Sequence, residues 1–238
     1  SVIDSVIQEA IGKETLPSLF ERVDKLCNGK PVDMIIGGPP CQAYSVAGRA
    51  RLGKKIEEDP RNDLYKFYVE FLKRYKPKMF VFENVLGIFT AKGGEPFRDL
   101  IRLVRELDYN IDFREQIASQ HGVLQKRHRV IIVGWQNKRD TQEDTSYHYP
   151  YLLEEQMPYK MMRDLFCDLP IVKAGEGTLC GIVHYTKPLS DMEYLKKSGI
   201  RGVLSFTTQH IARPNNPTDR EIYKQAVEQW NEGKRLRY

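Results

Sequence analysis

The residue of this chain best suited to covalent chemistry is a cysteine on a proline-rich turn. Cys41 follows Pro39 and Pro40, which in turn follow the apolar run Met34–Ile36, a pattern typical of a buried strand. Proline fixes φ, so the turn would hold a thiolate at one defined position against an electrophile. A free cysteine is more often a small buried apolar residue, so the neighbouring sequence must decide.

Further polar groups stand where two other strand-like runs end or begin. Met79–Phe82 precedes an acid and an amide, and Val130–Gly134 follows a basic segment. The polar residues concerned are Glu83, Asn84, Gln125, Arg127 and Arg129. Because active sites of open α/β sheets lie at the carboxyl ends of their strands, we expect Cys41 and Glu83 at one edge. A carboxyl group there can transfer a proton, and arginine donors suit carbonyl and phosphate oxygens.

Taken in order, these blocks resemble those of the C5-cytosine DNA methyltransferases. The matching blocks are Pro-Cys-Gln (Pro40, Cys41, Gln42), Glu-Asn-Val (Glu83, Asn84, Val85) and Gln-x-Arg-x-Arg (Gln125, Arg127, Arg129). The segment Arg61–Leu64 is similar to the family segment that follows the mobile catalytic loop. Each block is short, but three in the family order, each beside a strand end, indicate a shared function.

The resemblance implies a covalent methyl transfer. Cys41 would add to C6 of cytosine, so that C5 can take a methyl group from S-adenosylmethionine. Protonated Glu83 would assist at N3, and Arg127 and Arg129 would contact the base O2 and a phosphate. The supporting residues would be Pro40, Gln42, Asn84 and Gln125. Pro40 and Leu64 would also line part of the cofactor pocket, and the target base must be flipped out of the duplex.

A basic cluster follows the cysteine block, although the net charge is only +5. Its members are Arg49, Arg51, Lys54 and Lys55. Segment 43–60, which contains them, also holds Gly48 and Gly53. Basic groups beside the presumed chemistry favour a polyanionic substrate over a merely solvated surface. The resemblance implies that this segment closes on double-stranded DNA.

Helix-like and strand-like segments alternate over residues 1 to about 140. This alternation predicts an α/β fold with a mostly parallel sheet covered on both faces. The expected helices include Val2–Ile11, Leu16–Cys27, Asp63–Lys76 and Phe97–Leu107, and the expected strands are Asp33–Ile36, Met79–Phe82, Ile111–Ala118 and Val130–Gly134. The resemblance implies the Rossmann-like sheet of S-adenosylmethionine-dependent methyltransferases, incomplete on its N-terminal side because the glycine-rich cofactor block is not found.

After Asn137 the sequence becomes richer in Tyr, Pro, Gly and Asn, and only Asp219–Trp230, capped by Thr218 or Asp219, has clear helical spacing. The resemblance implies a partial catalytic domain over residues 1–140 and part of a smaller, irregular, target-recognition domain over 141–238. Ser205–Arg213 offers groups suited to base edges. The blocks missing at both ends predict a fragment, completed by further segments or by a second chain.

Composition argues against membrane-spanning, secreted, zinc-binding and disulfide-rich proteins. Hydrophobic content of 41% and charged content of 29% are those of a soluble globular protein. Neither a membrane-spanning run nor a signal peptide is visible, which predicts a cytoplasmic, bacterial protein without a membrane partner. The four cysteines form no C-x-x-C pair, so neither a zinc site nor a disulfide framework is expected.

Three alternatives stay open on the residues alone. A tRNA-directed cytosine-5 methyltransferase would share the blocks, but its typical Cys-Phe-Thr tripeptide does not occur here. A DNA-binding relative without catalysis would fit the absent cofactor block. A thiol hydrolase would need a histidine beside Cys41, for which His121, His128 and His184 are candidates.

Overall fold

The computed structural model describes residues 5–40, 63–137, 149–155 and 158–234. These residues fall into two compact units, Ser1–Met157 (unit 1) and Pro158–Tyr238 (unit 2). The functional roles expected for two domains stay predictions.

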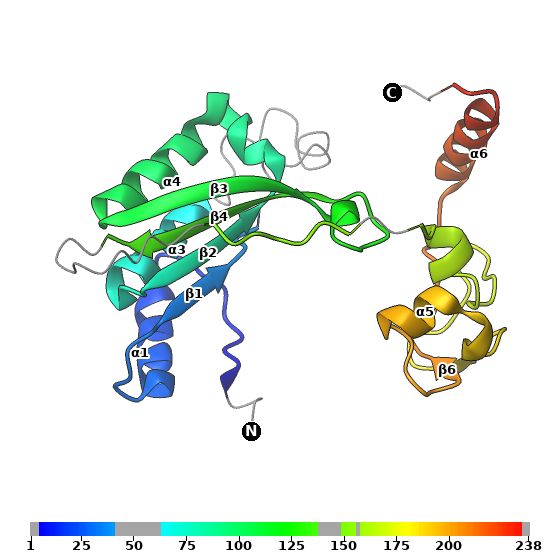
Figure 1. Cartoon of the computed structure of the whole chain (residues 1–238), viewed down its shortest axis with the longest axis horizontal. Coiled ribbons are helices and arrows are strands. Elements are labelled where there is room, and N and C mark those ends of the chain that lie inside the picture. The colour runs from blue at the N-terminus through cyan, green and yellow to red at the C-terminus, as the bar shows by residue number, and fades with distance from the viewer. Residues whose placement is uncertain (1–4, 41–62, 138–148, 156–157, 235–238) are drawn as a thin grey trace. The chain divides into compact units, whose positions relative to one another are not determined.

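Unit 1 is built on a four-stranded sheet of order β1-β2-β4-β3 (Figure 1). The strands are β1 (Met34–Gly37), β2 (Met79–Asn84), β3 (Tyr109–Ile117) and β4 (His128–Gln136). β1 pairs with β2 in parallel, whereas β4 lies between β2 and β3 and runs antiparallel to both. The sheet is therefore mixed, and the expectation of a mostly parallel sheet was wrong for β4. The short connection 118–127 explains this, because a parallel return needs a longer crossover.

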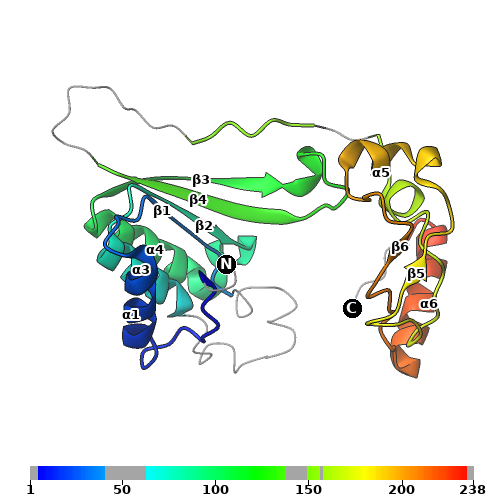
Figure 2. The same cartoon turned by 90° about the horizontal axis from the view of Figure 1, so that it is seen from below.

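Coverage of both sheet faces was also expected, but α3 (Leu64–Tyr75) and α4 (Glu95–Glu106) lie on the same face (Figure 2). Their apolar residues share one core cluster with Phe80 and Phe82 of β2. The physical reason is topological. α3 links β1 to β2 and α4 links β2 to β3, so successive right-handed crossovers advance across the sheet in one direction and stay on one side. On the opposite face, Ile36 of β1 is 73% exposed.

Local sequence accounts for the limits of α3. The helix ends where Lys76 adopts a left-handed φ of 44°, and Pro77 follows, which cannot continue it. Its apolar face is buried through Tyr65, Tyr68, Val69 and Leu72. The sheet beneath is tightly packed, because a Cβ at Gly134 would lie 2.0 Å from Cε1 of Phe80.

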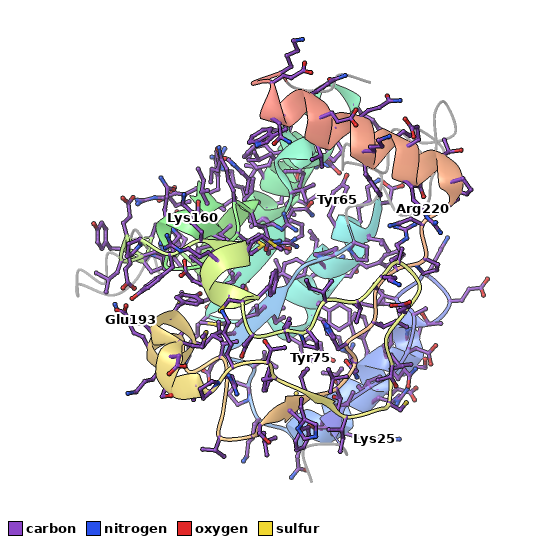
Figure 3. All side chains as sticks on the ribbon, turned by 90° about the vertical axis from the view of Figure 1, so that its right-hand side faces the viewer. Lys25, Tyr65, Tyr75, Lys160, Glu193 and Arg220 are labelled. Atoms are coloured by element: carbon purple, nitrogen blue, oxygen red, sulfur yellow. The ribbon has the colours of Figure 1, made fainter. Side chains whose placement is uncertain are left out.

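The first helix of the chain, α1 (Leu16–Cys27), packs on α3. The rings of Phe20 and Phe71 meet edge to face at 5.0 Å, and the Tyr75 hydroxyl donates to Asp24 Oδ1 at 2.9 Å. Tyr75 and Lys25, the residue after Asp24, are labelled in Figure 3. The helix expected over Val2–Ile11 was wrong, since residues 6–11 are irregular. A short isolated helix is marginal in water, and residues 9–11 line a cavity instead.

Unit 2 has little regular structure. Its elements are the π-helical turn η7 (Met161–Leu165), the two-stranded antiparallel sheet of β5 (Val183–His184) and β6 (Phe206–Thr207), the turn η8 (Leu189–Asp191) and the helices α5 (Glu193–Ser198) and α6 (Pro217–Asn231). A buried ion pair links Asp168 Oδ2 to Arg201 Nη1 at 2.7 Å. The Arg201 guanidinium also lies 3.9 Å from the Tyr185 ring centroid. The pair thus ties together three separate loop segments.

The helix predicted near the C-terminus is present as α6, but its cap differs from the prediction. Asn216, not Thr218 or Asp219, is the N-cap residue, and its side chain accepts a hydrogen bond from Asp219 N at 2.7 Å. An Asn before Pro217 suits this position because its side-chain oxygen reaches the free backbone N–H groups of the first turn. None of the described helices combines the length and apolar character needed to cross a bilayer.

Candidate active site

The end of β1 and the end of β2 meet at one edge of the sheet. Gly38, Pro39 and Pro40 follow β1, and Glu83 is the second-last residue of β2. The two are in close contact, because a Cβ built on Gly38 would lie only 2.9 Å from Oε2 of Glu83. The sheet therefore brings the carboxylate against the turn that leads to Cys41, as parallel pairing of β1 and β2 requires.

Glu83 forms an ion pair with Arg129, whose Nε lies 2.5 Å from Glu83 Oε1. Glu83 is paired across the ladder with Ile131, so Arg129 lies diagonally opposite on the same face of the sheet. The Glu83 side chain is 41% exposed and the Arg129 side chain 21%. Among the described residues Nε has no well-aligned hydrogen-bond partner, whereas Nη1 donates to His128 O at 2.7 Å. The ion pair is thus partly exposed and imperfectly aligned. A ligand could therefore replace either partner of the pair.

Asn84 projects to the other face of the sheet. It is paired with Val130 and only 2% exposed. Its Oδ1 accepts a hydrogen bond from Val85 N at 2.9 Å, which fixes the chain as it leaves β2. A hydrogen bond from Asn84 to the proline turn is not present among the described residues, so that supporting role stays a prediction.

The two arginines of the basic block lie in different settings. Arg129 is within β4, whereas Arg127 and Gln125 are exposed in the connection before it, joined by a backbone hydrogen bond from Arg127 N to Gln125 O of 2.9 Å. No described hydrogen bond or ion pair involves the side chains of these two residues. His128 faces away from Arg129, and its Nδ1 lies 2.5 Å from Glu115 Oε1.

An apolar cavity of about 650 Å³ opens beside the same edge. Pro40 and Leu64, the two residues expected to contact the cofactor, both line it. Other walls come from Tyr68 and Phe71 of α3 and from residues 35–39. The volume is that of a small-molecule site. Residues 9–11 also line it, so Glu9 supplies a carboxylate that sequence reasoning missed, since no spacing pattern connects residue 9 with β1 or α3.

Several predicted site residues lie outside the described residues: Cys41, Gln42, Arg49, Arg51, Lys54 and Lys55. Of the histidines proposed for a thiol hydrolase, His121 has both ring nitrogens occupied, by Leu153 O at 2.9 Å and Gln116 Oε1 at 2.8 Å. His128 Nδ1 contacts the Glu115 carboxylate, and His184 belongs to unit 2. Within the described ranges no group of His, Cys, Asp and Glu side chains could hold a metal ion.

Comparison with known proteins identifies the class that this fold and site define. Residues 19–237 match the family model of the C-5 cytosine-specific DNA methylases, so the chain belongs to that family. The similar curated proteins are type II methyltransferases. M.Bpa9945I of Bacillus paralicheniformis is 34% identical over 87% of this chain and 48% of its own length. M1.HphI of Haemophilus parahaemolyticus is 34% identical over 78% of this chain and 48% of its own length.

A solved structure agrees with this assignment. A prophage-encoded E. coli protein, assigned as a DNA modification methyltransferase, is 26% identical with a TM-score of 0.51. The alignment covers 76% of this chain and 47% of that protein. The chain thus spans about half the length of the relatives it matches.

Proposed function

We propose that the protein containing this chain is a bacterial type II modification enzyme that methylates C5 of a flipped-out cytosine in double-stranded DNA. The observation that carries the proposal is the contact of Glu83 with the Gly38 turn on one side and with Arg129 on the other. This places an acid and a guanidinium beside the turn that ends in Cys41. Family membership supports the same chemistry.

In the proposed reaction the Cys41 thiolate forms a bond to C6 of cytosine. The electron pair displaced from the C5–C6 double bond makes C5 nucleophilic, and a proton given to N3 by Glu83 favours this addition. Arg129, whose guanidinium lies beside Glu83, donates to the base O2 and leaves the carboxyl group aimed at N3. After methylation the C5 proton is lost to water, the thiolate departs from C6 and the N3 proton returns to Glu83, which restores the aromatic ring.

The apolar cavity fits part of the methyl donor. Its volume suits a ligand of that size, and Glu9 is the one described acid in its wall, able to accept hydrogen bonds from a hydroxyl or amino group. Bound there, S-adenosylmethionine would supply an electrophilic methyl group to C5. Pro40 and Leu64 would hold it by apolar contact, and the proline turn would join the cofactor cavity to Cys41.

Double-stranded DNA is the proposed partner. The basic cluster Arg49, Arg51, Lys54 and Lys55 would contact the phosphate backbone, with Arg127 as a further exposed cation close to β4. Residues 141–238 would provide part of the target-recognition domain. Base flipping is required because the C6 atom of a stacked cytosine is out of reach of a thiolate.

The test is covalent trapping by the complete enzyme. DNA with 5-fluorocytosine at the target keeps the adduct, because fluorine at C5 cannot leave as the proton does. We expect a denaturant-stable complex with the parent enzyme and with Cys180→Ser, which removes an exposed thiol of unit 2. Cys41→Ser should abolish both trapping and methyl transfer. A covalent adduct formed by Cys41→Ser would contradict the nucleophile assignment.

The same assay separates the alternatives. A tRNA methyltransferase would methylate and be trapped on RNA and not on duplex DNA. A relative that binds DNA without catalysis would shift DNA in a gel, yet would neither trap it nor incorporate labelled methyl groups.

A further inference from the structure

Tyr68 bridges the two strands whose ends form the candidate active site. It lies on α3, is 8% exposed, and packs edge to face on Phe82 at a centroid distance of 5.1 Å. Its hydroxyl lies 3.0 Å from Val81 O of β2 and 3.2 Å from Ile35 O of β1. One hydroxyl has a single hydrogen, so it donates to these two carbonyl groups in alternation.

The ring of Tyr68 also sets the distance between α3 and β1. A Cβ at Gly37 would lie 2.6 Å from Cε2 of Tyr68, so only glycine lets the ring approach this closely. Within the described residues β1 pairs with β2 alone, and its other edge carries no strand. β1 has four residues, so its backbone ladder to β2 is short, and Tyr68 adds a side-chain tie from the helix side.

The cavity beside the proline turn lies between the elements that Tyr68 connects. Leu64, Tyr68 and Phe71 of α3 form one wall, and the chain from Ile35 to Pro40 forms another. We propose that Tyr68 is a positioning residue: by tying α3 to β1 and β2, it fixes the width of this cavity and the place from which the Gly38–Pro40 turn departs. The inference rests on the proposed function, because it takes the methyl donor as the ligand.

The test compares two buried tyrosines at different positions, each of which donates a hydrogen bond to a backbone carbonyl group. Tyr109 is likewise buried, and its hydroxyl donates to Pro77 O at 2.6 Å, where β2 and β3 begin and far from their carboxyl ends. Tyr68→Phe and Tyr109→Phe each remove one hydroxyl-to-carbonyl hydrogen bond. We expect Tyr109→Phe to lose at least as much thermal stability as Tyr68→Phe, because its hydroxyl also interacts with the Gln136 side chain, and this controls for a merely structural effect.

Binding of S-adenosylhomocysteine by the complete enzyme, measured by isothermal titration calorimetry, is the readout. We expect Kd to rise about fivefold in Tyr68→Phe, which is the effect of losing one typical hydrogen bond. In Tyr109→Phe we expect Kd to stay within about twofold of the parent value. Gly37→Ala, which displaces the ring but keeps the hydroxyl, should weaken binding as well and serves if Tyr68→Phe does not fold.

The outcomes separate this inference from the proposed function. Equal affinities in Tyr68→Phe and Tyr109→Phe, with the parent enzyme binding, would overturn the positioning role and leave the proposed function standing. Absence of binding by the parent enzyme would overturn the proposed use of this cavity for the methyl donor, and the role of Tyr68 with it.

Discussion

Replacing Gly38 by alanine tests whether the contact between the proline turn and Glu83 matters for catalysis. The new Cβ would lie 2.9 Å from Glu83 Oε2, while ordinary contact begins near 3.4 Å, so the carboxylate must retreat by about 0.5 Å. Misplacement of a catalytic group by about 1 Å costs about 100-fold in rate, so we expect about a tenfold loss, or about 1.4 kcal/mol.

Stability should change little. The atom displaced is the end of a flexible, partly exposed side chain, and the φ of Gly38 is not in the left-handed region. We therefore expect the free energy of unfolding to change by less than about 1 kcal/mol. Gly202→Ala is the matched control, because its Cβ would meet no atom within 4 Å.

The assay is the rate of adduct formation on 5-fluorocytosine DNA by the complete enzyme. A double-mutant cycle sharpens it: in a Glu83→Gln background, which has already lost the proton donor, Gly38→Ala should add much less than its tenfold effect. An unchanged rate in Gly38→Ala, or equal losses in Gly38→Ala and Gly202→Ala, would refute the reasoning.

Three further predictions concern stability. Gly134→Ala places a methyl group 2.0 Å from a buried ring of β2 and should cost about 3 kcal/mol in urea unfolding followed by tryptophan fluorescence; a loss below about 0.5 kcal/mol would show that the ring yields freely. The hydrogen bond from the Tyr65 hydroxyl holds the pKa of Asp99 below its usual value of 3.8, so its stabilisation is present above about pH 4 and is lost as pH falls through the lower folded pKa. Asp99→Asn should lower Tm at pH 7 and flatten the dependence of Tm on pH below 4, whereas an unaltered acid limb would exclude this linkage. Arg201→Met leaves Asp168, only 3% exposed, without its cation and should destabilise unit 2 by about 3–5 kcal/mol, most of it recovered when Asp168→Leu is added; no recovery in the double variant would argue against the ion pair as the cause.

Much of unit 1 follows from sequence patterns. The apolar runs around Met34–Ile36 and Met79–Phe82 are strands, and the amphipathic segment after Asp63 is α3, because side-chain periodicity and the stop at Pro77 are local properties. The meeting of Glu83 with the proline turn was expected from the rule that parallel strands end at one edge. Its observed contact with Gly38 agrees with that rule.

The remaining features depend on long-range packing. Nothing local in Val130–Gly134 indicates that β4 runs antiparallel between two other strands. Arg127 and Arg129 are two residues apart, so in an extended strand their side chains would point to the same face. Which of them pairs with Glu83 therefore depends on where β4 begins. The ion pair of Asp168 and Arg201 joins residues 33 positions apart and has no local pattern at all.

The register of β4 against β2 has a consequence for insertions and deletions. Side chains alternate along a strand, so one residue added between Arg129 and Val130 would turn Arg129 toward the core face, where Asn84 lies, and leave Glu83 without its cation. A residue added within 119–124 would be absorbed by the connection before Gln125 and the strand. In-frame insertions should therefore be tolerated at 119–124 and should inactivate the enzyme only a few codons downstream.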